Sequence, residues 1–501
     1  MPSSVIIIGA GYAGIGAARK LLDEGRDVFK VIVLEGGHRV GGRACTVNGK
    51  EMGGTYFHGI YGHPLYEYAS QHGIVGEPFT REFRWGFCEP GKAAPVDGSL
   101  PADIRDAVQE YASVLPSGDP AGYKNSIGTL LHQKFAEGNA KTGSIQLKSR
   151  AWRWRELVTR IASGCESSAD VSAAWWAGAE DLEGPNFPCP IGFQKLAEHM
   201  AVGLDVRYGA VVEKVQWGAS GVTVTCADGR SFQADAAVVT VSLGVLKESH
   251  GRLFEPALPP EKLRAMKGVS IGTVDKIFAD FSQTGDSSGK SACGDPVIAY
   301  HLLWNKPWEP TASVTEQARN QSPGRGRWPA FTGAAECVYG NSSRETGRTA
   351  QQHCGRGLPA AWADHPTCAV LWLTGDHAKM MEACSEEEVE EGVAALLAAY
   401  PAIPCPKSTP RIVRSSWGSD PLFRGSYSYV NAEGTPEDID TLAAPLMVSG
   451  RPVVCFAGEA THRQLTGTMG AAFLTGRNYF RNSQREAGRL LAAHRATQIS
   501  P

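Results

Sequence analysis

The sequence lacks several features that define other classes of protein. None of its apolar runs is long enough to span a bilayer, so no membrane-spanning helix is expected. The formal net charge of the 501 residues is only −3, which argues against the strongly basic surface that binds nucleic acid. We therefore expect neither a membrane nor a nucleic-acid partner, and no motif identifies a protein partner.

Paired cysteine motifs and targeting segments are also absent. The twelve cysteines are scattered, without the spacing of a zinc site or of a disulfide framework. No basic and then apolar leader precedes the first predicted strand, and Ile499-Ser500-Pro501 is not a peroxisomal address. We expect buried, reduced thiols, no metal site and a cytoplasmic protein.

The first forty residues have the pattern of a dinucleotide-binding βαβ unit: strand, Gly9-x-Gly11-x-x-Gly14, helix, strand and Glu35. Gly9 permits a tight turn, Gly11 lets the backbone approach a pyrophosphate, and Gly14 lets helix and strand pack closely. Unpaired N–H groups at the helix start favour phosphates, and Glu35 can accept hydrogen bonds from a ribose. This pattern predicts an adenine dinucleotide; the alternative is an ordinary tight turn.

Two further glycine-rich loops decide which dinucleotide is expected. Gly41-Gly42-Arg43 follows soon after the acid, and Gly53-Gly54-Thr55 comes next. These loops have no role in a plain NAD fold but suit a longer cofactor, so FAD is favoured over NAD. Near the other end of the chain, an apolar strand runs into Gly458-Glu459 and predicts a second phosphate- or ribityl-type site. For the Gly41-Gly42-Arg43 stretch, a mobile glycine-rich loop is the alternative.

The middle of the chain mixes helical and strand patterns. We predict helices at residues 64–72, 102–115, 127–136, 152–162 and 386–400, and strands at 206–217, 222–226, 231–241 and 272–281. Ser385 opens the last helix with a capping box, so its three acids are better explained as a helix start than as a polyamine site. Residues 282–296, 309–329 and 341–358 have the composition of surface insertions.

Taken together, the motifs resemble those of the flavin-dependent polyamine oxidases, with the plant-like spermine and thermospermine oxidase branch closest. The matching segments are Gly9-x-Gly11-x-x-Gly14, Gly41-Gly42-Arg43, Thr55-x-x-His58-Gly59, Gly272-Thr273-x-x-Lys276, Trp417-Gly418, residues 425–429 and residues 458–462. The resemblance implies an α/β fold with a Rossmann-type FAD domain built from residues 1–75, 190–267 and 450–501. An inserted α+β substrate domain with a mixed sheet would take residues 76–189 and 268–449.

The resemblance also assigns two catalytic residues. Lys276 lies in a strand pattern where a lysine is usually a solvated edge residue, but the family places one here, bonded through water to flavin N5. A buried ammonium there can organise water for imine hydrolysis or favour flavin reoxidation. The histidine matching His58 lies near the substrate amine, where it can accept a proton or hold the amine. An ordinary histidine bonded to nearby backbone is the alternative.

Other site residues follow from the same resemblance. It implies cofactor contacts by Gly9, Gly11, Gly14, Glu35, Arg43, Gly54, Thr55, Val212, Trp417, Gly458, Glu459, Thr468 and Met469. Tyr427 and Tyr429 would wall the flavin face and attract a cationic amine, although core packing is an even alternative. Glu180 and Asp181 lie where the family carries a tunnel carboxylate, with a solvated loop equally expected.

Two departures from related enzymes matter. Thr468 stands where some relatives have an aromatic wall, which leaves room for a hydroxyl contact to the substrate. Residues 464–470 contain no cysteine, so the FAD is expected to be non-covalent. The implied reaction is oxidation of a carbon next to a secondary amine of spermine, thermospermine or a relative. Oxygen would be the acceptor, with a shorter polyamine, 3-aminopropanal and hydrogen peroxide as products.

Three rivals stay open at this point. A lysine demethylase of the same superfamily is disfavoured because no separate helical domain or coiled-coil insertion is visible. An L-amino-acid oxidase needs an arginine for the substrate carboxylate, and Arg424 keeps that possibility open. A non-catalytic FAD-binding paralogue is opposed by the intact Lys276, His58 and flavin loops.

Overall fold

The computed structural model describes residues 3–25, 28–76, 84–92, 102–137, 145–180, 182–281, 298–303, 336–340, 368–403 and 408–479. Asp181 and the three predicted surface insertions lie outside these residues. Within the described ranges, no helix combines the length and hydropathy needed to cross a membrane. Nor do three or more His, Cys, Asp or Glu side chains in these ranges gather where they could hold a metal ion.

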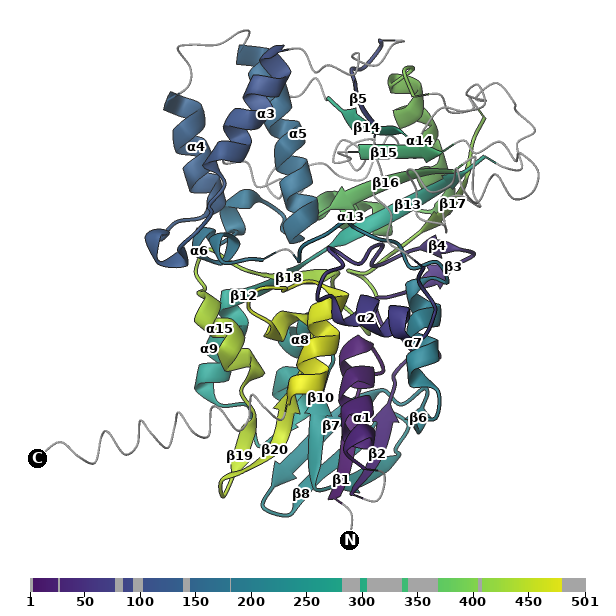
Figure 1. Ribbon diagram of the computed structural model, residues 1–501, viewed down its shortest axis with the longest axis vertical. Coiled ribbons are helices and arrows are strands. Elements are labelled where there is room, and N and C mark those ends of the chain that lie inside the picture. Colours follow the sequence, from purple (N-terminus) through teal and green to yellow (C-terminus); the bar gives the residue numbers. More distant parts are fainter. Residues whose placement is uncertain are drawn as a thin grey trace, which may run out of the picture.

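A six-stranded sheet carries the glycine-rich unit (Figure 1). Its order is β19-β20-β10-β1-β2-β6, and all neighbours are parallel except the β19–β20 pair. The strands are β1 (Ser3–Ile8), β2 (Phe29–Leu34), β6 (Val206–Arg207), β10 (Ala236–Val239), β19 (Leu446–Val448) and β20 (Arg451–Phe456). Three distant parts of the chain therefore bring the carboxyl ends of their strands to one edge, where cofactors bind in such sheets.

Both faces of this sheet are covered, which explains why its strands are continuous apolar runs. Helices α1 (Tyr12–Glu24) and α7 (Phe193–Ala201) and the helical residues 469–479 pack on one face. A second sheet of order β11-β7-β8-β9 packs on the other face. Its strands are β7 (Val212–Gly218), β8 (Gly221–Cys226), β9 (Ser231–Ala234) and β11 (Phe254–Glu255).

Two of the predicted strands are too long. In the structure each of these runs forms two shorter strands, one in the six-stranded sheet and one in the four-stranded sheet. Residues 206–217 split into β6 and β7 at Gly209, whose φ of +61° turns the chain. Residues 231–241 split into β9 and β10 at Asp235, whose carboxylate accepts hydrogen bonds from the main-chain N–H (2.7 Å) and the hydroxyl (2.8 Å) of Ser4. A local turn thus ends each apolar run.

A mixed six-stranded sheet of order β17-β13-β16-β15-β14-β5 forms the other half of the molecule (Figure 1). Its strands are β5 (Arg84–Cys88), β13 (Val274–Asp280), β14 (Ile298–Leu302), β15 (Glu336–Gly340), β16 (Cys368–Thr374) and β17 (Arg411–Arg414). Only β14 and β5 are parallel neighbours. The strand predicted at 272–281 is β13, whereas β12 (Val269–Gly272) pairs separately with β18 (Tyr427–Val430).

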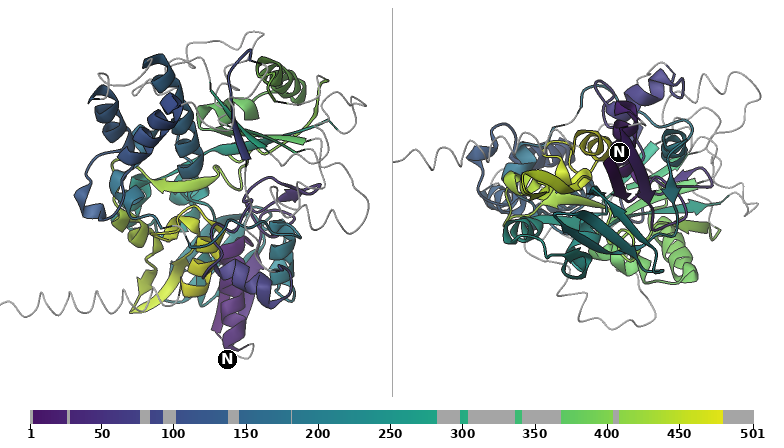
Figure 2. Two further views of the ribbon diagram at one scale, coloured as in Figure 1. Left: turned by 45° about the horizontal axis from the view of Figure 1, so that its top comes forward. Right: turned by 90° about the horizontal axis from the view of Figure 1, so that it is seen from below.

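Two groups of helices flank this sheet. One face packs on α13 (Asp376–Glu382) and α14 (Glu386–Ala399), and α14 opens with the predicted Ser385 capping box. Helices α3 (Ala102–Val114), α4 (Ile127–Glu137) and α5 (Ile145–Ser163) stand together beside the sheet in both Figure 1 and Figure 2. Helix α5 begins earlier than predicted. The remaining elements are β3 (Thr46–Val47), β4 (Lys50–Glu51), α2 (Pro64–Gln71), α6 (Ala173–Ala177), α8 (Leu243–Leu253), α9 (Pro260–Gly268), α15 (Pro436–Ala443), and the single 3-10 turns Pro120–Gly122, Ser168–Asp170 and Glu459–Thr461.

Candidate active site

Glycines are needed in the cofactor loops for two different reasons, close packing of the chain and open space for a ligand. A Cβ added at Gly14 would lie 1.9 Å from the Gly9 carbonyl oxygen, so close packing of helix on strand requires glycine there. A Cβ at Gly11 would meet no described atom nearer than the Gly42 Cα, at 4.0 Å. Gly458, at the end of β20, likewise has no described atom within 4 Å of an added Cβ. Gly11 and Gly458 therefore leave open the space that a pyrophosphate and ribityl chain would take.

This contrast gives a prediction for two alanine variants. Gly14→Ala would clash and should lose about 1 to 3 kcal/mol of stability or more. Gly11 has φ −71°, which alanine adopts freely, so Gly11→Ala should fold normally. Its methyl group should nevertheless weaken FAD binding by about tenfold or more, which is about 1.4 kcal/mol. Thermal unfolding of the apoprotein and FAD titration measure the two effects, and an unstable Gly11→Ala apoprotein would contradict the assignment.

Glu35 ties the ends of β1 and β2 together. Its carboxylate accepts hydrogen bonds from the main-chain N–H groups of Ala10 (2.7 Å) and Gly37 (2.8 Å). Its main-chain oxygen accepts from Ala210 N–H at 2.8 Å, and Val212 begins β7 two residues later. Glu35 and Val212 thus lie on neighbouring segments, at the end of the sheet where an adenosine group would sit.

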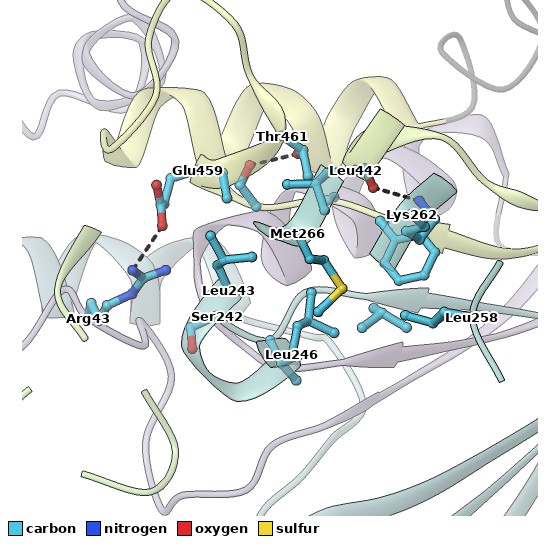
Figure 3. A pocket seen from close by; sticks show the side chains of 16 residues that line it. Arg43, Ser242, Leu243, Leu246, Leu258, Lys262, Met266, Leu442, Glu459 and Thr461 are labelled. Carbon is cyan, nitrogen blue, oxygen red and sulfur yellow. Dashed lines mark hydrogen bonds and ion pairs between the residues drawn. The ribbon is translucent and has the colours of Figure 1, made fainter. Parts of the chain in front are cut away.

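Arg43 and Glu459 form an ion pair between the second glycine-rich loop and the end of β20. Arg43 Nη1 lies 3.0 Å from Glu459 Oε1 and donates to the Ser426 carbonyl at 2.6 Å. The other oxygen of Glu459, a residue that is 5% exposed, accepts from the Gly467 N–H at 3.1 Å and from the Ser428 N–H and hydroxyl. Figure 3 shows the pair at the rim of a pocket whose other labelled side chains include Leu243, Leu246, Leu258 and Met266.

Lys276 is buried at the point where the two halves of the molecule meet. Its ammonium donates to the main-chain oxygens of Glu51 (2.9 Å) and Gly53 and to the Thr55 hydroxyl. All three N–H groups of the ammonium thus have an acceptor. The side chains of β13 alternate, so Lys276 shares with Phe278 the face that packs on Met52 and Trp417. The strand therefore aims this lysine at the predicted cofactor loop 53–55.

Glu51 is a buried carboxyl group close to Lys276 that the sequence analysis did not single out. It is 2% exposed and accepts from the Thr46 hydroxyl (2.9 Å) and the Phe193 N–H (3.1 Å), while Oε2 has no partner among the described residues. Burial raises the pKa of Glu51 to about 7 and lowers the pKa of Lys276 to about 8, and their attraction offsets both shifts in part. Both groups therefore titrate near neutral pH.

These shifts predict an unusual dependence of stability on pH. Folded Glu51 holds its proton more tightly than the unfolded chain, so stability falls as pH rises from about 4.5 to about 7. Folded Lys276 releases its proton more readily, so stability recovers between about pH 8 and 10.5. We expect each limb to be worth up to about 3 kcal/mol, with a minimum between pH 7 and 8. When unfolding free energies are measured across pH, the acidic limb should be shallower in Glu51→Gln than in the wild type, and an unchanged profile would contradict the pKa of Glu51.

Trp417 and Met469 lie against the same loop, and Thr468 directly precedes Met469. The Trp417 indole N–H donates to the Met52 carbonyl at 3.2 Å, and a Cβ at Gly54 would lie 2.5 Å from Met469 Cε. The Thr468 hydroxyl donates to the Leu465 carbonyl (2.8 Å) and accepts from the Ala471 N–H (3.0 Å), as a cap of the last helix does. It therefore cannot donate to a substrate but keeps one lone pair to accept an N–H.

The predicted substrate residues lie on neighbouring loops. His58 is exposed, and the residue before it, Phe57, pairs through its backbone with Phe187. Glu180 is exposed, and its Oε1 accepts from the Gln464 side chain at 3.2 Å. The structure thus brings the loop of His58 together with the segment after Glu180, and brings Glu180 to the final flavin loop. It does not describe Asp181.

The two predicted wall tyrosines differ in their surroundings. Tyr427 is half-buried, donates its hydroxyl to the Ile161 carbonyl and lies 3.6 Å from an added Cβ at Gly467. Tyr429 is 4% exposed and belongs to the apolar core. Burial raises the pKa of both phenols, so both stay neutral. Tyr427 adjoins the flavin loop, whereas little of the Tyr429 ring is left to contact a ligand.

His63 is a further residue of the site that no sequence motif indicated. His63 is 4% exposed and packs on Gly470, and burial, with the nearby His58 charge, lowers the pKa of His63 to about 4. His63 is therefore neutral at physiological pH. The side chain of Arg424 is partly exposed, with Nη2 4.0 Å from Glu248 Oε1 of α8. The only sequence hint for Glu51 was its place two residues before Gly53-Gly54.

Known proteins share both the sequence pattern and the fold. The sequence profile of the family "Flavin containing amine oxidoreductase" matches residues 12–479. Polyamine oxidase 1 of Oryza sativa subsp. japonica is 29% identical, over 98% of this chain and 97% of that protein. Lysine-specific histone demethylase 1 homolog 2 of Arabidopsis thaliana is 30% identical over 94% of this chain but 57% of its own length.

A solved structure extends the likeness to the fold. Cyclohexylamine oxidase from Brevibacterium oxydans IH-35A superposes with a TM-score of 0.63 at 19% identity, over 98% of this chain and all of that one. The predicted α/β fold with a Rossmann-type cofactor sheet and a mixed second sheet is thereby confirmed. The open cradle at Gly11 and Gly458 and the Arg43–Glu459 pair fit the predicted FAD. The chain belongs to the flavin-containing amine oxidoreductase family and is an FAD-dependent oxidoreductase.

Proposed function

We propose that the protein is a polyamine oxidase that acts on spermine, thermospermine or a related polyamine. It oxidises a carbon next to a secondary amine, and the imine hydrolyses to a spermidine-type polyamine and 3-aminopropanal. Oxygen is the electron acceptor and becomes hydrogen peroxide. The observation that carries this proposal is the nearly full-length likeness to a polyamine oxidase in a chain that keeps a buried, fully bonded Lys276 at the cofactor loop.

The residues of the chain have defined parts in this reaction. Bound FAD supplies the two-electron oxidation. An alkylammonium has a pKa near that of lysine, about 10.4, and must lose a proton before its carbon can be oxidised. His58, exposed on its loop, accepts that proton directly or through water. All three N–H groups of the Lys276 ammonium are bonded to the protein, so it acts through its positive charge, which favours return of electrons to oxygen.

Carboxylates and aromatic rings supply the recognition of a polycation. Glu180 is exposed beside the final flavin loop, where it attracts a distal ammonium group. The neutral Tyr427 ring next to Gly467 offers a face to a cationic amine. The spacing between Glu180 and the oxidised carbon would then set which polyamine is preferred. A tenfold preference corresponds to only about 1.4 kcal/mol.

Aerobic turnover with product analysis tests the proposal. Purified protein is incubated separately with spermine, thermospermine, spermidine and N1-acetylspermine, and the amine products and hydrogen peroxide are quantified. We expect a tetraamine to give spermidine-type product, 3-aminopropanal and peroxide in equal amounts. Product from none of these polyamines would overturn the proposal.

A second candidate is oxidation of a methylated lysine side chain, which the demethylase relative favours by its 30% identity. Both substrates are secondary or tertiary amines on a flexible chain, so the cofactor chemistry does not separate them. A methyl-lysine peptide in the same assay does, because only a demethylase releases formaldehyde from it. An L-amino-acid oxidase is disfavoured because Arg424 faces Glu248.

A further inference from the structure

Asp275, the neighbour of Lys276 on β13, is a wholly buried carboxyl group, with 0% exposure. Its Oδ1 accepts hydrogen bonds from the Ser415 hydroxyl (2.7 Å) and the Trp417 N–H (3.1 Å). Among the described residues, no N–H or hydroxyl donor reaches Oδ2. The carboxyl group of Glu382, at the end of α13, binds the same turn: Asp275 Oδ1 accepts from the Trp417 N–H and Glu382 Oε1 from the N–H of the next residue, Gly418.

Glu382 binds the next two residues of the turn that Asp275 binds through Ser415 and Trp417. Its Oε1 accepts from the Gly418 N–H and its Oε2 from the Ser419 N–H, both at 2.7 Å. A Cβ at Gly418 would stand only 3.1 Å from Glu382 Oε1, so the glycine permits this approach. Two carboxyl groups from different elements thus bind one turn of chain, residues 415–419.

If Asp275 and Glu382 were both ionised, the repulsion between their negative charges would be strongly unfavourable in this buried position. Among the described residues, Glu382 and the Tyr427 phenol are the titratable groups that interact with Asp275, and neither carries a positive charge. The guanidinium of Arg414 lies at the same end of α13, where it donates to the main-chain oxygens of Met381 and Cys384. Lys276 points to the opposite face of β13, because neighbouring side chains of a strand alternate. A proton between the carboxyl groups would remove the repulsion and satisfy Oδ2, as in other carboxyl pairs that cannot both ionise.

We propose that Asp275 and Glu382 share one proton, carried by Asp275 Oδ2 and donated to Glu382, and that this pair positions the Trp417 turn against Lys276. Asp275 is the partner that holds the proton, since it is fully buried whereas Glu382 is partly exposed. Burial, followed by the bond to Glu382 and its charge, holds the pKa of Asp275 well above its usual value. The shared proton gives Asp275 Oδ2 the hydrogen-bond partner that it lacks among the described residues.

The pair acts on the active site through two short connections. The Lys276 main-chain N–H donates to the Ser415 hydroxyl at 2.9 Å, and that hydroxyl donates to Asp275. The Trp417 main chain is held by Asp275, while its indole N–H reaches Met52 beside the cofactor loop. Asp275 is therefore a positioning residue for Lys276 and Trp417. This consequence rests on the proposed function, but the shared proton does not.

Infrared difference spectroscopy tests the proton directly. Wild-type protein minus Asp275→Asn at neutral pH should show the carbonyl stretch of one neutral carboxylic acid, which shifts in heavy water. Glu387→Gln, on the exposed first turn of α14, should show no such band. A difference spectrum containing only ionised carboxylate would overturn the proposal, whatever the protein oxidises.

Two variants test the positioning role and separate it from simple structural damage. Asparagine keeps the Oδ1 acceptor and offers an N–H to Glu382, so Asp275→Asn should keep FAD affinity within about threefold of the wild type. Asp275→Ala removes both and should weaken FAD binding about tenfold or more. Equal losses in both variants, or none in either, would contradict the role. These readouts need no amine substrate, so they stand apart from the outcome of the turnover assay.

The pH dependence of stability gives an independent readout. Folded Asp275 keeps its proton where the unfolded chain releases it, so the wild type becomes less stable as pH rises above about 4. Asp275→Asn has no such proton. Its melting temperature relative to the wild type should therefore increase from pH 4.5 to pH 8, and a constant or falling difference would overturn the shared proton.

Discussion

Lys276→Met should lower turnover with a tetraamine by about 10² to 10³-fold, the effect of removing one preorganised charged donor from an active site. The ammonium is buried, and its three N–H groups bind the Glu51 and Gly53 carbonyls and the Thr55 hydroxyl. No other lysine in the described residues makes these contacts with the cofactor loop. Steady-state rates on FAD-loaded protein, with flavin absorbance to verify loading, measure the loss.

The fold should survive this substitution. Leaving its three buried acceptors unpaired costs about 1 to 3 kcal/mol each. Removing the ammonium, whose pKa burial lowers to about 8, restores about 3 kcal/mol. The gain offsets only part of the cost, so the melting temperature should fall, and turnover is compared only for folded, FAD-loaded protein. FAD-loaded Lys276→Met that keeps turnover within about threefold would contradict a catalytic role.

Lys148→Met is the matched control. Lys148 is also buried, at 6% exposure, but lies in α5 with its ammonium 2.9 Å from Glu110. Its loss leaves a partly buried carboxylate without its partner, so stability should fall while turnover stays at the wild-type level. A similar loss of turnover in both variants would mean that the Lys276 result reflects stability alone.

Glu459→Ala should abolish FAD retention and destabilise the protein by about 3 to 5 kcal/mol, the cost of breaking a buried ion pair from one side. The carboxylate binds Arg43, Ser428 and Gly467, three groups that are far apart in the sequence. Its removal takes the acceptor from the Gly467 N–H and from Ser428, leaves Arg43 with only its bond to the Ser426 carbonyl, and frees the ends of three loops. Denaturant unfolding and the flavin content of purified protein measure the two parts.

Glu24→Gln provides the comparison for charge loss at the surface. Glu24 pairs with Lys20 one turn earlier on α1, at 3.0 Å, and both side chains are over one-third exposed. An exposed pair of this kind is worth about 0.3 to 0.5 kcal/mol, so the variant should retain FAD. If Glu459→Ala behaved like Glu24→Gln, the Arg43–Glu459 pair would have no part in holding the cofactor.

The cofactor loops could be predicted from sequence because their signals are local. Gly9, Gly11 and Gly14 lie within one turn and carry backbone requirements that few other patterns share. Lys276 was identified through its motif, although a strand lysine alone would have been taken for a solvated edge residue. Its burial depends on Glu51, Gly53 and Thr55, which lie more than 200 residues earlier.

The rest of the site depends on contacts that no local pattern encodes. Asp275 and Lys276 are adjacent polar residues in a strand, and only the packing of α13 on one face separates their roles. Glu382 ends a helix that the sequence analysis did not predict. The divided strands at Gly209 and Asp235 were missed because their hydrogen bonds reach residues of the first two strands or the loop after them. Such partners become visible only in the folded chain.

Anaerobic reduction of the bound flavin is the most direct measurement of the central claim. The FAD-loaded protein is mixed without oxygen with spermine, thermospermine, spermidine, N1-acetylspermine or an amino acid, and flavin absorbance is followed in time. A polyamine oxidase predicts rapid bleaching by a tetraamine and none by amino acids. Bleaching by amino acids alone, or by none of these compounds, would contradict it.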